Sequence, residues 1–186
     1  VPKVFMNIKK NFKSTKFKIL EIKNLKLNKI LKINIKNKKK LGSDRIANAI
    51  GAKKLKNCLI IDFGTATTFD VIKNGIYDGG VIAPGVNLSI KNLSQATALL
   101  PLINLKTHQK NYGKNTIEAL NAGFVWGYEG LINNIIDKII SRSKIKYKIL
   151  LTGGYANFFK KMIKKKVVID QHITIKGIAN AYKDLV

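Results

Sequence analysis

The stretch LIIDFGTATTFDVIKNG, Leu59 to Gly75, decides the fold. An apolar run that ends at Asp62 predicts a buried strand, and residues 67–73 predict a second strand. The dipeptide Asn74-Gly75 is a strong signal of a two-residue hairpin turn, and it leads into the strand-like residues 76–85. The stretch therefore predicts three consecutive strands.

Asp62 lies at the end of the first of these strands. A carboxylate in such a place is costly unless a cation, a metal ion or backbone donors meet it. One interpretation is a ligand site. The other is an aspartate that caps its own turn by accepting from the amides of Gly64 and Thr65.

The remaining chain alternates between helix and strand signals. Alternation in residues 31–35 predicts a half-buried strand, residues 36–40 an exposed loop, and residues 41–55 a helix that begins at Ser43 or Asp44. Further elements are expected as follows: helices near 87–97 and 115–140, a strand, glycine turn and helix over 147–163, a short strand from 167, and a closing helix. This order predicts an α/β fold in which helices cover a mixed sheet.

The charge of +25 on 186 residues is typical of nucleic-acid-binding proteins. However, only Arg45 and Arg142 are arginines, and the abundant Lys, Ile and Asn fit an AT-rich coding bias. The charge then predicts only non-specific attraction to anions. A regulatory or nucleic-acid-binding protein stays the second hypothesis, and it predicts salt-sensitive DNA binding with a sequence preference.

The single cysteine, Cys58, cannot form a disulfide within the chain and fits a reducing cytoplasm. No stretch reaches the roughly 18 apolar residues of a membrane span. The N-terminal residues lack the apolar segment of a secretory signal. We therefore expect a cytoplasmic protein without a membrane partner.

Two strand ends combine glycine with threonine, in DFGTATT (62–68) and LLTGG (150–154). Glycine lets backbone N–H groups approach an anion, and threonine hydroxyls add donors, so both are candidate phosphate cradles. Tight turns use the same residues for conformational reasons alone. Asp44, at a helix start, is either a cap or a general base.

Four blocks in this order closely resemble the type III pantothenate kinase family, whose relatives include Bvg accessory factors. They are LGSDRIANAIGA (41–52), residues 59–101, GKNTIEALNAGFVWGYEGLINNII (113–136) and LLTGGYA (150–156). The resemblance implies the actin, sugar kinase and Hsp70-like superfamily, in which two ribonuclease H-like domains clasp ATP. It also implies transfer of the ATP γ-phosphoryl group to pantothenate, the first step of coenzyme A synthesis, with Mg²⁺, a monovalent cation (K⁺ or NH₄⁺) and a homodimer.

The same resemblance assigns roles to individual residues. Asp44 matches the base that takes the proton of the substrate hydroxyl, and Asp62 matches the ligand of the monovalent cation. The other matches are Gly42, Ser43, Arg45 and Thr116 for pantothenate, and Gly64, Thr65, Gly153 and Gly154 for ATP.

We expect residues 1–57, with the GSDR helix, to be the end of the first ribonuclease H-like domain, and residues 58–186 to be the second domain. The family's first phosphate loop, Asp-x-Gly-Asn-Thr, has no counterpart in these 186 residues, and a substrate-site tyrosine corresponds to Ile35. Because lost phosphate donors weaken transition-state stabilisation, we expect the chain alone to be a poor kinase or an inactive one, and the full-length parent to be competent. A degenerate paralogue that keeps the fold but not the reaction is a further alternative.

Overall fold

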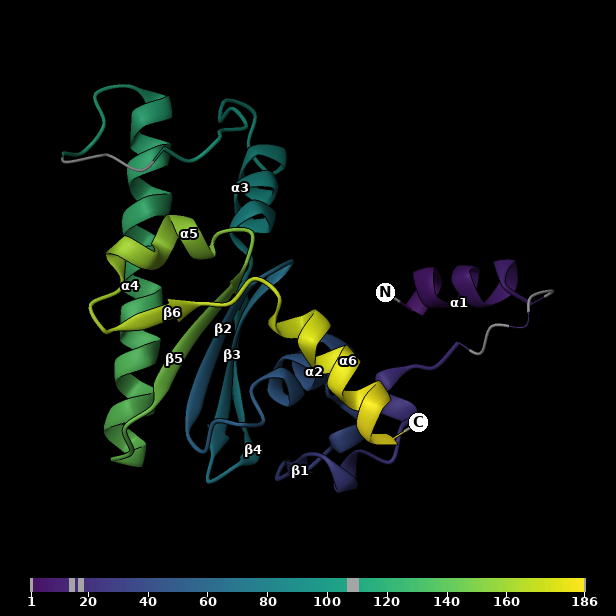
Figure 1. Ribbon diagram of the computed structural model, residues 1–186. Coiled ribbons are helices and arrows are strands. Elements are labelled where there is room, and N and C mark those ends of the chain that lie inside the picture. The colour runs from purple at the N-terminus through teal and green to yellow at the C-terminus, as the bar shows by residue number, and fades with distance from the viewer. Residues whose placement is uncertain (1, 14–15, 17–18, 107–110, 186) are drawn as a thin grey trace.

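The computed structural model describes residues 2–13, 16, 19–106 and 111–185. Within these ranges a six-stranded sheet forms the centre of the molecule (Figure 1). Its strands are β1 (Lys32–Ile33), β2 (Cys58–Phe63), β3 (Ala66–Lys73), β4 (Ile76–Pro84), β5 (Lys148–Gly153) and β6 (Val167–Ile169).

The strands lie in the order β1-β4-β3-β2-β5-β6. β3 is antiparallel to both β2 and β4, whereas β5 is parallel to β2 and to β6. Strands β2 to β6 thus have the ribonuclease H-like arrangement, which confirms the predicted mixed sheet. The β3–β4 hairpin turns at Asn74 and Gly75, whose φ angles of 53° and 75° suit a type I′ turn.

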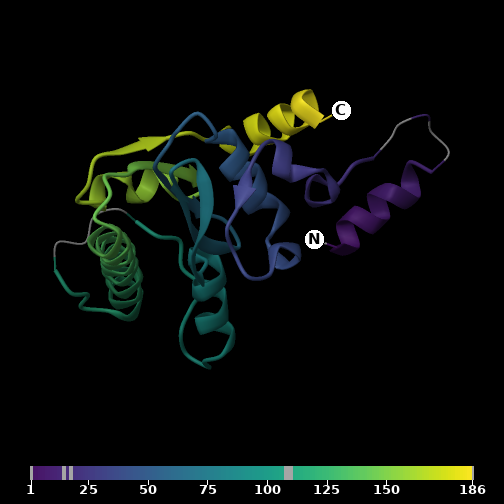
Figure 2. The ribbon, with the colours of Figure 1, turned by 90° about the horizontal axis from the view of Figure 1, so that it is seen from below.

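Helices cover both faces of the sheet (Figures 1 and 2). α2 and α6 lie on one face, and α4 lies on the other with α5. The helices are α1 (Pro2–Asn11), α2 (Ser43–Gly51), α3 (Val86–Gln95), α4 (Thr116–Ser143), α5 (Ala156–Phe159) and α6 (Ile173–Leu185). Among the described helices, even the longest is not apolar enough to cross a bilayer.

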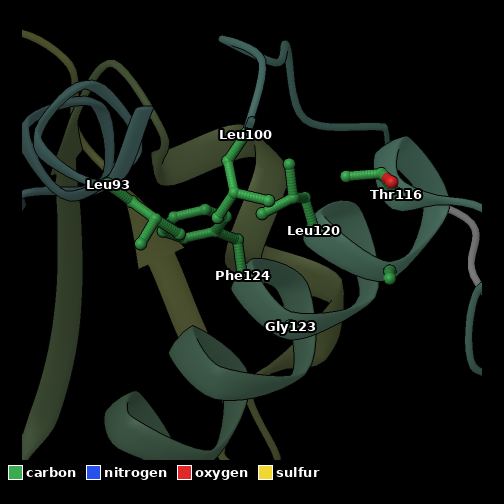
Figure 3. Close-up of a pocket in the computed structure, with 7 residues that line it drawn as sticks. Leu93, Leu100, Thr116, Leu120, Gly123 and Phe124 are labelled. Atoms are coloured by element: carbon green, nitrogen blue, oxygen red, sulfur yellow. The ribbon is translucent and has the colours of Figure 1, made fainter. Parts of the chain in front are cut away.

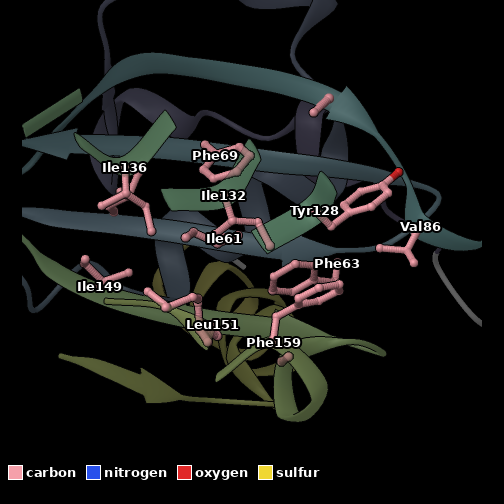
Figure 4. Packing of buried hydrophobic residues seen from close by; sticks show 14 of the residues in the cluster. Ile61, Phe63, Phe69, Val86, Tyr128, Ile132, Ile136, Ile149, Leu151 and Phe159 are labelled. Carbon is pink, nitrogen blue, oxygen red and sulfur yellow. The ribbon is translucent and has the colours of Figure 1, made fainter. Parts of the chain in front are cut away.

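Period-two alternation along β2 gives each face of the sheet its own core. Leu59, Ile61 and Phe63 belong to the cluster beneath α4 and α5 (Figure 4). Cys58 and Ile60 point the other way and belong to the cluster beneath α2 and α6. Because both faces are buried, the strand reads as a continuous apolar run.

α2 and α6 pack unusually closely because each contributes a glycine to the contact. A Cβ atom at Gly51 would collide with the carbonyl oxygen of Ile173, and one at Gly177 would collide with that of Ala47. The second cluster also joins residues on both sides of the predicted boundary, including Ile46 and Ile60. The division into domains 1–57 and 58–186 stays a prediction.

The N-terminal 40 residues differ most from expectation. The strand predicted over 31–35 is reduced to Lys32 and Ile33, which pair with the start of β4. The predicted loop 36–40 contains a 3-10 turn at Lys38–Lys40. Helix α1, which was not predicted, lies to one side of the sheet (Figures 1 and 2). Frequent lysines interrupt the apolar periodicity in these residues, so neither helix α1 nor the short extent of β1 is evident from the sequence.

Candidate active site

Polar groups gather on the sheet face that α2 covers. Asp62 on β2 pairs across the sheet with Thr68 on β3, and Ile60 pairs with Asp70. Directly paired residues point to the same face, as do residues two apart on one strand. Asp62, Thr68 and Asp70 therefore form a polar patch within an otherwise apolar layer.

The first turn of α2 adds Asp44 to this patch. Gly42 is the N-cap residue of the helix, and a Cβ atom there would collide with the Asp44 carboxylate. The charge of Asp44 contributes to raised pKa values at both Asp62 and Asp70, behind the larger effect of burial. The two carboxylates that sequence patterns singled out, Asp44 and Asp62, are therefore near enough for their charges to interact.

Asp62 is held by a side chain that was not predicted. Its Oδ2 accepts from Nδ2 of Asn48 at 2.8 Å. Burial raises the pKa of Asp62 and the charge of Asp44 adds to this, although the Asn48 bond acts in the opposite sense. Gly64 N–H donates to the carbonyl of Ala66 at 3.1 Å, so this amide does not cap Asp62 as the turn interpretation required.

Asn48 is itself completely buried and links three elements. Its Oδ1 accepts from the hydroxyl of Thr174 on α6 at 2.6 Å, while its amide group reaches β2. The sequence signal was a polar residue on the apolar face of α2, between Ile46 and Ile50. Asn48, itself held by Thr174, thus fixes Oδ2 of Asp62. The other oxygen, Oδ1, faces Gly153, because a Cβ atom added to Gly153 would lie 2.7 Å from it.

Arg45 points into the sheet instead of into solvent. Its Nε donates to Oδ1 of Asp70 at 2.7 Å, and the hydroxyl of Tyr77 donates to the same oxygen at 2.7 Å. The pKa of Asp70 rises to about 6, because burial outweighs the opposing effects of Arg45 and Tyr77. Neither Asp70 nor Tyr77 was predicted, although a lone aspartate within the apolar residues 69–72 was a usable signal.

The two glycine-rich turns open into one cavity of about 480 Å³. Its lining residues are Phe63, Gly64, Thr65, Asn87, Leu88, Lys91, Gly154 and Tyr155. The turns are nevertheless tight turns as well, since Gly154 N–H donates to the carbonyl of Phe63 at 3.1 Å. The Tyr155 hydroxyl donates to Oδ1 of Asn87 at 2.5 Å across the cavity wall. A cradle for a phosphate chain here would use Thr65 and Lys91 more than these glycine amides.

Gly153 is required by the backbone conformation and by close packing, whereas Gly154 is not. The φ of Gly153, 85°, favours glycine, and an added Cβ would also lie 2.6 Å from the carbonyl oxygen of Phe63. Gly153 therefore allows β5 to end directly against Asp62. Gly154 has open space at its Cβ position and lines the cavity.

Thr116 lies neither in the polar patch nor in the cavity of the glycine turns. It is the first residue of α4, after Asn115, whose side chain accepts from Glu118 N–H at 3.0 Å as the helix cap. It lines a different, apolar cavity of about 390 Å³ between α3 and α4 (Figure 3). Leu93, Leu100, Leu120 and Phe124 line the same cavity.

A mixed sheet of this order, with Asp62 at the end of β2 and a cavity between two glycine turns, defines an α/β protein of the ribonuclease H-like fold. The comparisons with known proteins narrow this class. A family profile described as type III pantothenate kinase matches residues 1–138. The chain belongs to the type III pantothenate kinase family.

Individual relatives agree with the family. The type III pantothenate kinase of Pelagibacter ubique is 51% identical over 183 residues, which are 97% of this chain and 73% of that protein. The enzyme of the same name from a Sulfurihydrogenibium species is 41% identical over 151 residues, 80% of this chain and 60% of the relative. The chain thus spans only part of the length of these relatives.

A solved structure from Campylobacter jejuni, described as a Baf family transcriptional activator, has the same fold. Its TM-score is 0.66 at 25% identity, and the match covers 95% of this chain and 77% of that one. This structure agrees with the resemblance to Bvg accessory factors.

Proposed function

We propose that this chain binds ATP and pantothenate and transfers the γ-phosphoryl group of ATP to the terminal hydroxyl of pantothenate. One observation carries the proposal. Asp44 on α2 and Asp62 on β2 lie close enough for the charge of one to raise the pKa of the other, beside the turns that line the 480 Å³ cavity. Phosphoryl transfer requires chiefly positioning and charge stabilisation, and this arrangement can supply both.

Asp44 would act as the general base. A base must come within hydrogen-bond distance of the hydroxyl that it activates. The first turn of α2 places the carboxylate of Asp44 beside Gly42, at an exposed position that a substrate can reach. Gly42 and Ser43 would line the pantothenate site, with Arg45 as the cation for its carboxylate.

Asp62 would hold a monovalent cation, K⁺ or NH₄⁺. Asn48 occupies Oδ2 of Asp62. Burial, with a smaller contribution from the charge of Asp44, raises the pKa of Asp62 and so disfavours its ionised form. A bound cation would relieve this cost. No group of three or more acidic, histidine or cysteine side chains suited to a metal ion occurs in the described part of the chain. Mg²⁺ would therefore arrive with the ATP phosphates, which are its usual partners in kinases.

The nucleotide would occupy the cavity of Gly64, Thr65 and Gly154, and the neighbouring Gly153 would let β5 end beside Asp62. Lys91 is the one cation among the lining residues of this cavity, and it supplies positive charge for a phosphate group.

A homodimer would complete the pantothenate site. Thr116 lies away from Asp44 in the same chain, so we assign its substrate contact to the site of a second subunit. Exposed apolar side chains, which an interface requires, occur on α3, on the loop that follows it and at the start of α4: Leu93, Leu99, Leu102 and Ile117. The buried free thiol of Cys58 fits a cytoplasmic protein.

The test is a single-turnover assay with enzyme in excess over ATP, so that slow turnover still yields measurable product. Mass spectrometry should detect phosphopantothenate only when ATP, Mg²⁺ and pantothenate are all present. Asp44→Asn should abolish the product while its far-UV circular dichroism spectrum stays unchanged. Failure of the wild-type chain to bind pantothenate in calorimetry, or equal product from D44N, would contradict the proposal.

A further inference from the structure

Asp70 is a completely buried carboxylate for which the proposed reaction has no role. It lies in the middle of β3, where Phe69 on one side belongs to the apolar core. Removing an ionised carboxylate from water is expensive unless it is paired and hydrogen-bonded. The partners of Asp70 should therefore explain why it is there.

Those partners converge on the guanidinium group of Arg45. Oδ1 of Asp70 accepts from Nε of Arg45 and from the hydroxyl of Tyr77, both at 2.7 Å. The Tyr77 ring lies with its centroid 5.9 Å from the central carbon of the guanidinium. The Asp70 carboxylate thus holds the Nε edge of the Arg45 guanidinium, and the Tyr77 ring lies against the same group.

Gly80 on β4 completes the enclosure. It pairs with Asp70 across the sheet, and a Cβ atom there would come within 2.6 Å of Nη2 of Arg45. The same Cβ atom would come within 2.1 Å of the carbonyl oxygen of Phe69, so the missing side chain leaves room for the backbone of β3 as well as for the guanidinium. Arg45 keeps 13% of its side chain exposed, which limits contact with a substrate to a small part of it.

A single charged hydrogen bond holds Arg45 in this orientation. Nη2 of Arg45 and Oδ2 of Asp70 are both buried without a hydrogen-bond partner among the described residues, so the pair does not form the usual two-bond fork. Asp70 is also the one carboxylate within ion-pair distance of Arg45 in the described ranges. If Asp70 lost its charge, the neighbouring Asp44 would be the next available anion for Arg45.

We infer that Asp70 is a positioning residue: with Tyr77 it holds Arg45 against Gly80, presents the exposed end of Arg45 to an acidic substrate, and keeps Arg45 away from the Asp44 carboxylate. The substrate part of this inference rests on the proposed function, in which Arg45 binds pantothenate. The holding of Arg45 does not depend on it.

Arginine side-chain NMR tests the positioning directly, because the chain has only two arginines, Arg45 and Arg142. The exposed Arg142 is an internal control. In the wild type, the Nε–H signal of Arg45 should be shifted downfield and exchange with water at least about tenfold more slowly than that of Arg142, as expected for a buried charged hydrogen bond. Asp70→Asn should remove both properties.

Asp78→Asn is the matched control. Asp78 is an exposed carboxylate on β4 that accepts from Asn34 at 2.8 Å, and its replacement should leave the Arg45 signal unchanged. Tyr77→Phe, which keeps the ring but removes the hydroxyl, should cause an intermediate change and serves if D70N does not fold. An Arg45 signal that stays unchanged in D70N, or in Y77F when D70N is unfolded, overturns the inference.

Pantothenate titration of the same samples tests the consequence for the substrate. D70N should raise the Kd for pantothenate by roughly 10- to 100-fold, as loss of an orienting partner typically does. If D70N releases Arg45 but binds pantothenate as tightly as the wild type, the presentation of Arg45 to the substrate is wrong. If the wild type itself does not bind pantothenate, the proposed function fails, while the NMR comparison still decides the role of Asp70.

Discussion

The side-chain amide of Asn48 donates to Oδ2 of Asp62 at 2.8 Å, although the two residues lie on different elements. Asn48 also accepts from Thr174 at 2.6 Å, so one buried amide ties α2 to β2 and to α6. A carboxylate held through one oxygen has a fixed orientation while its other oxygen stays available. This relationship couples the packing of three elements to the geometry of the candidate cation site.

Asn48→Ala should destabilise the chain by about 2–4 kcal/mol, because it removes two hydrogen bonds and leaves the Asp62 carboxylate without its donor. Asn34→Ala is the control, since it also removes an amide-to-carboxylate bond, of 2.8 Å to Asp78, but at an exposed position. It should cost less than about 1 kcal/mol. Urea unfolding measures the loss in the free energy of unfolding for each variant. Equal losses would show that the buried network stabilises the fold no more than the exposed hydrogen bond does.

Sequence patterns singled out two carboxylates of the candidate site, but not the residues that hold them in place. Asp62 was found because one charged residue ended an apolar run, and Asp44 because it began a helix. Asp70 carried the same signal as Asp62, but its partner, Arg45, lies 25 residues earlier on another element. Only the packing of α2 on the sheet brings these two together, and no local pattern contains that information.

The same limit applies to the close contact of α2 with α6. Gly51 and Gly177 are 126 positions apart, and neither lies in a turn that would mark it as special. Short-range patterns did predict the β3–β4 hairpin, because the residues at Asn74 and Gly75 determine their own backbone conformation. In the N-terminal 40 residues, frequent lysines obscured the periodicity on which such predictions depend.

Gly177→Ala should destabilise the chain by about 1–3 kcal/mol, because the new methyl group would collide with the backbone carbonyl of Ala47. Gly127→Ala is the matched helix control. Gly127 has open space at its Cβ position on α4, so alanine there should stabilise the helix by about 0.5–1 kcal/mol. Thermal unfolding of the two variants should shift in opposite directions, and a neutral G177A would disprove the close packing.

Stability should fall as pH rises from about 4 to about 6. Burial raises the pKa of Asp70 from 3.8 to about 6, so the folded chain retains a proton that the unfolded chain releases in this range. The contribution of Asp70 is complete below its unfolded pKa and is lost as pH rises through its folded pKa. At about 1.4 kcal/mol per pKa unit, the contribution is on the order of 3 kcal/mol.

Asp70→Asn should flatten this pH dependence, because asparagine resembles the protonated carboxyl group at every pH. Arg45 and Asp44 on α2 and Tyr77 on β4 are the groups that act on Asp70, and all stay in the variant. Asp62, whose pKa is also raised, should leave a smaller slope of the same sign. Urea unfolding from pH 4.5 to 7.5 gives the free energy of unfolding of the wild type and of D70N. The difference between the two values removes the general effect of net charge, which both proteins share. Parallel curves would show that Asp70 titrates at its ordinary pKa.

Asp62→Asn should separate cation binding from folding. Asparagine can still accept the Asn48 hydrogen bond and removes a charge from beside Asp44, so the variant should be as stable as the wild type or slightly more stable without a cation. A cation that binds only the folded chain raises its melting temperature by mass action. KCl or NH₄Cl should therefore raise the melting temperature of the wild type more than LiCl at equal ionic strength, and D62N should not distinguish among these salts. A wild-type protein that responds equally to all three salts would remove the support for Asp62 as a cation ligand.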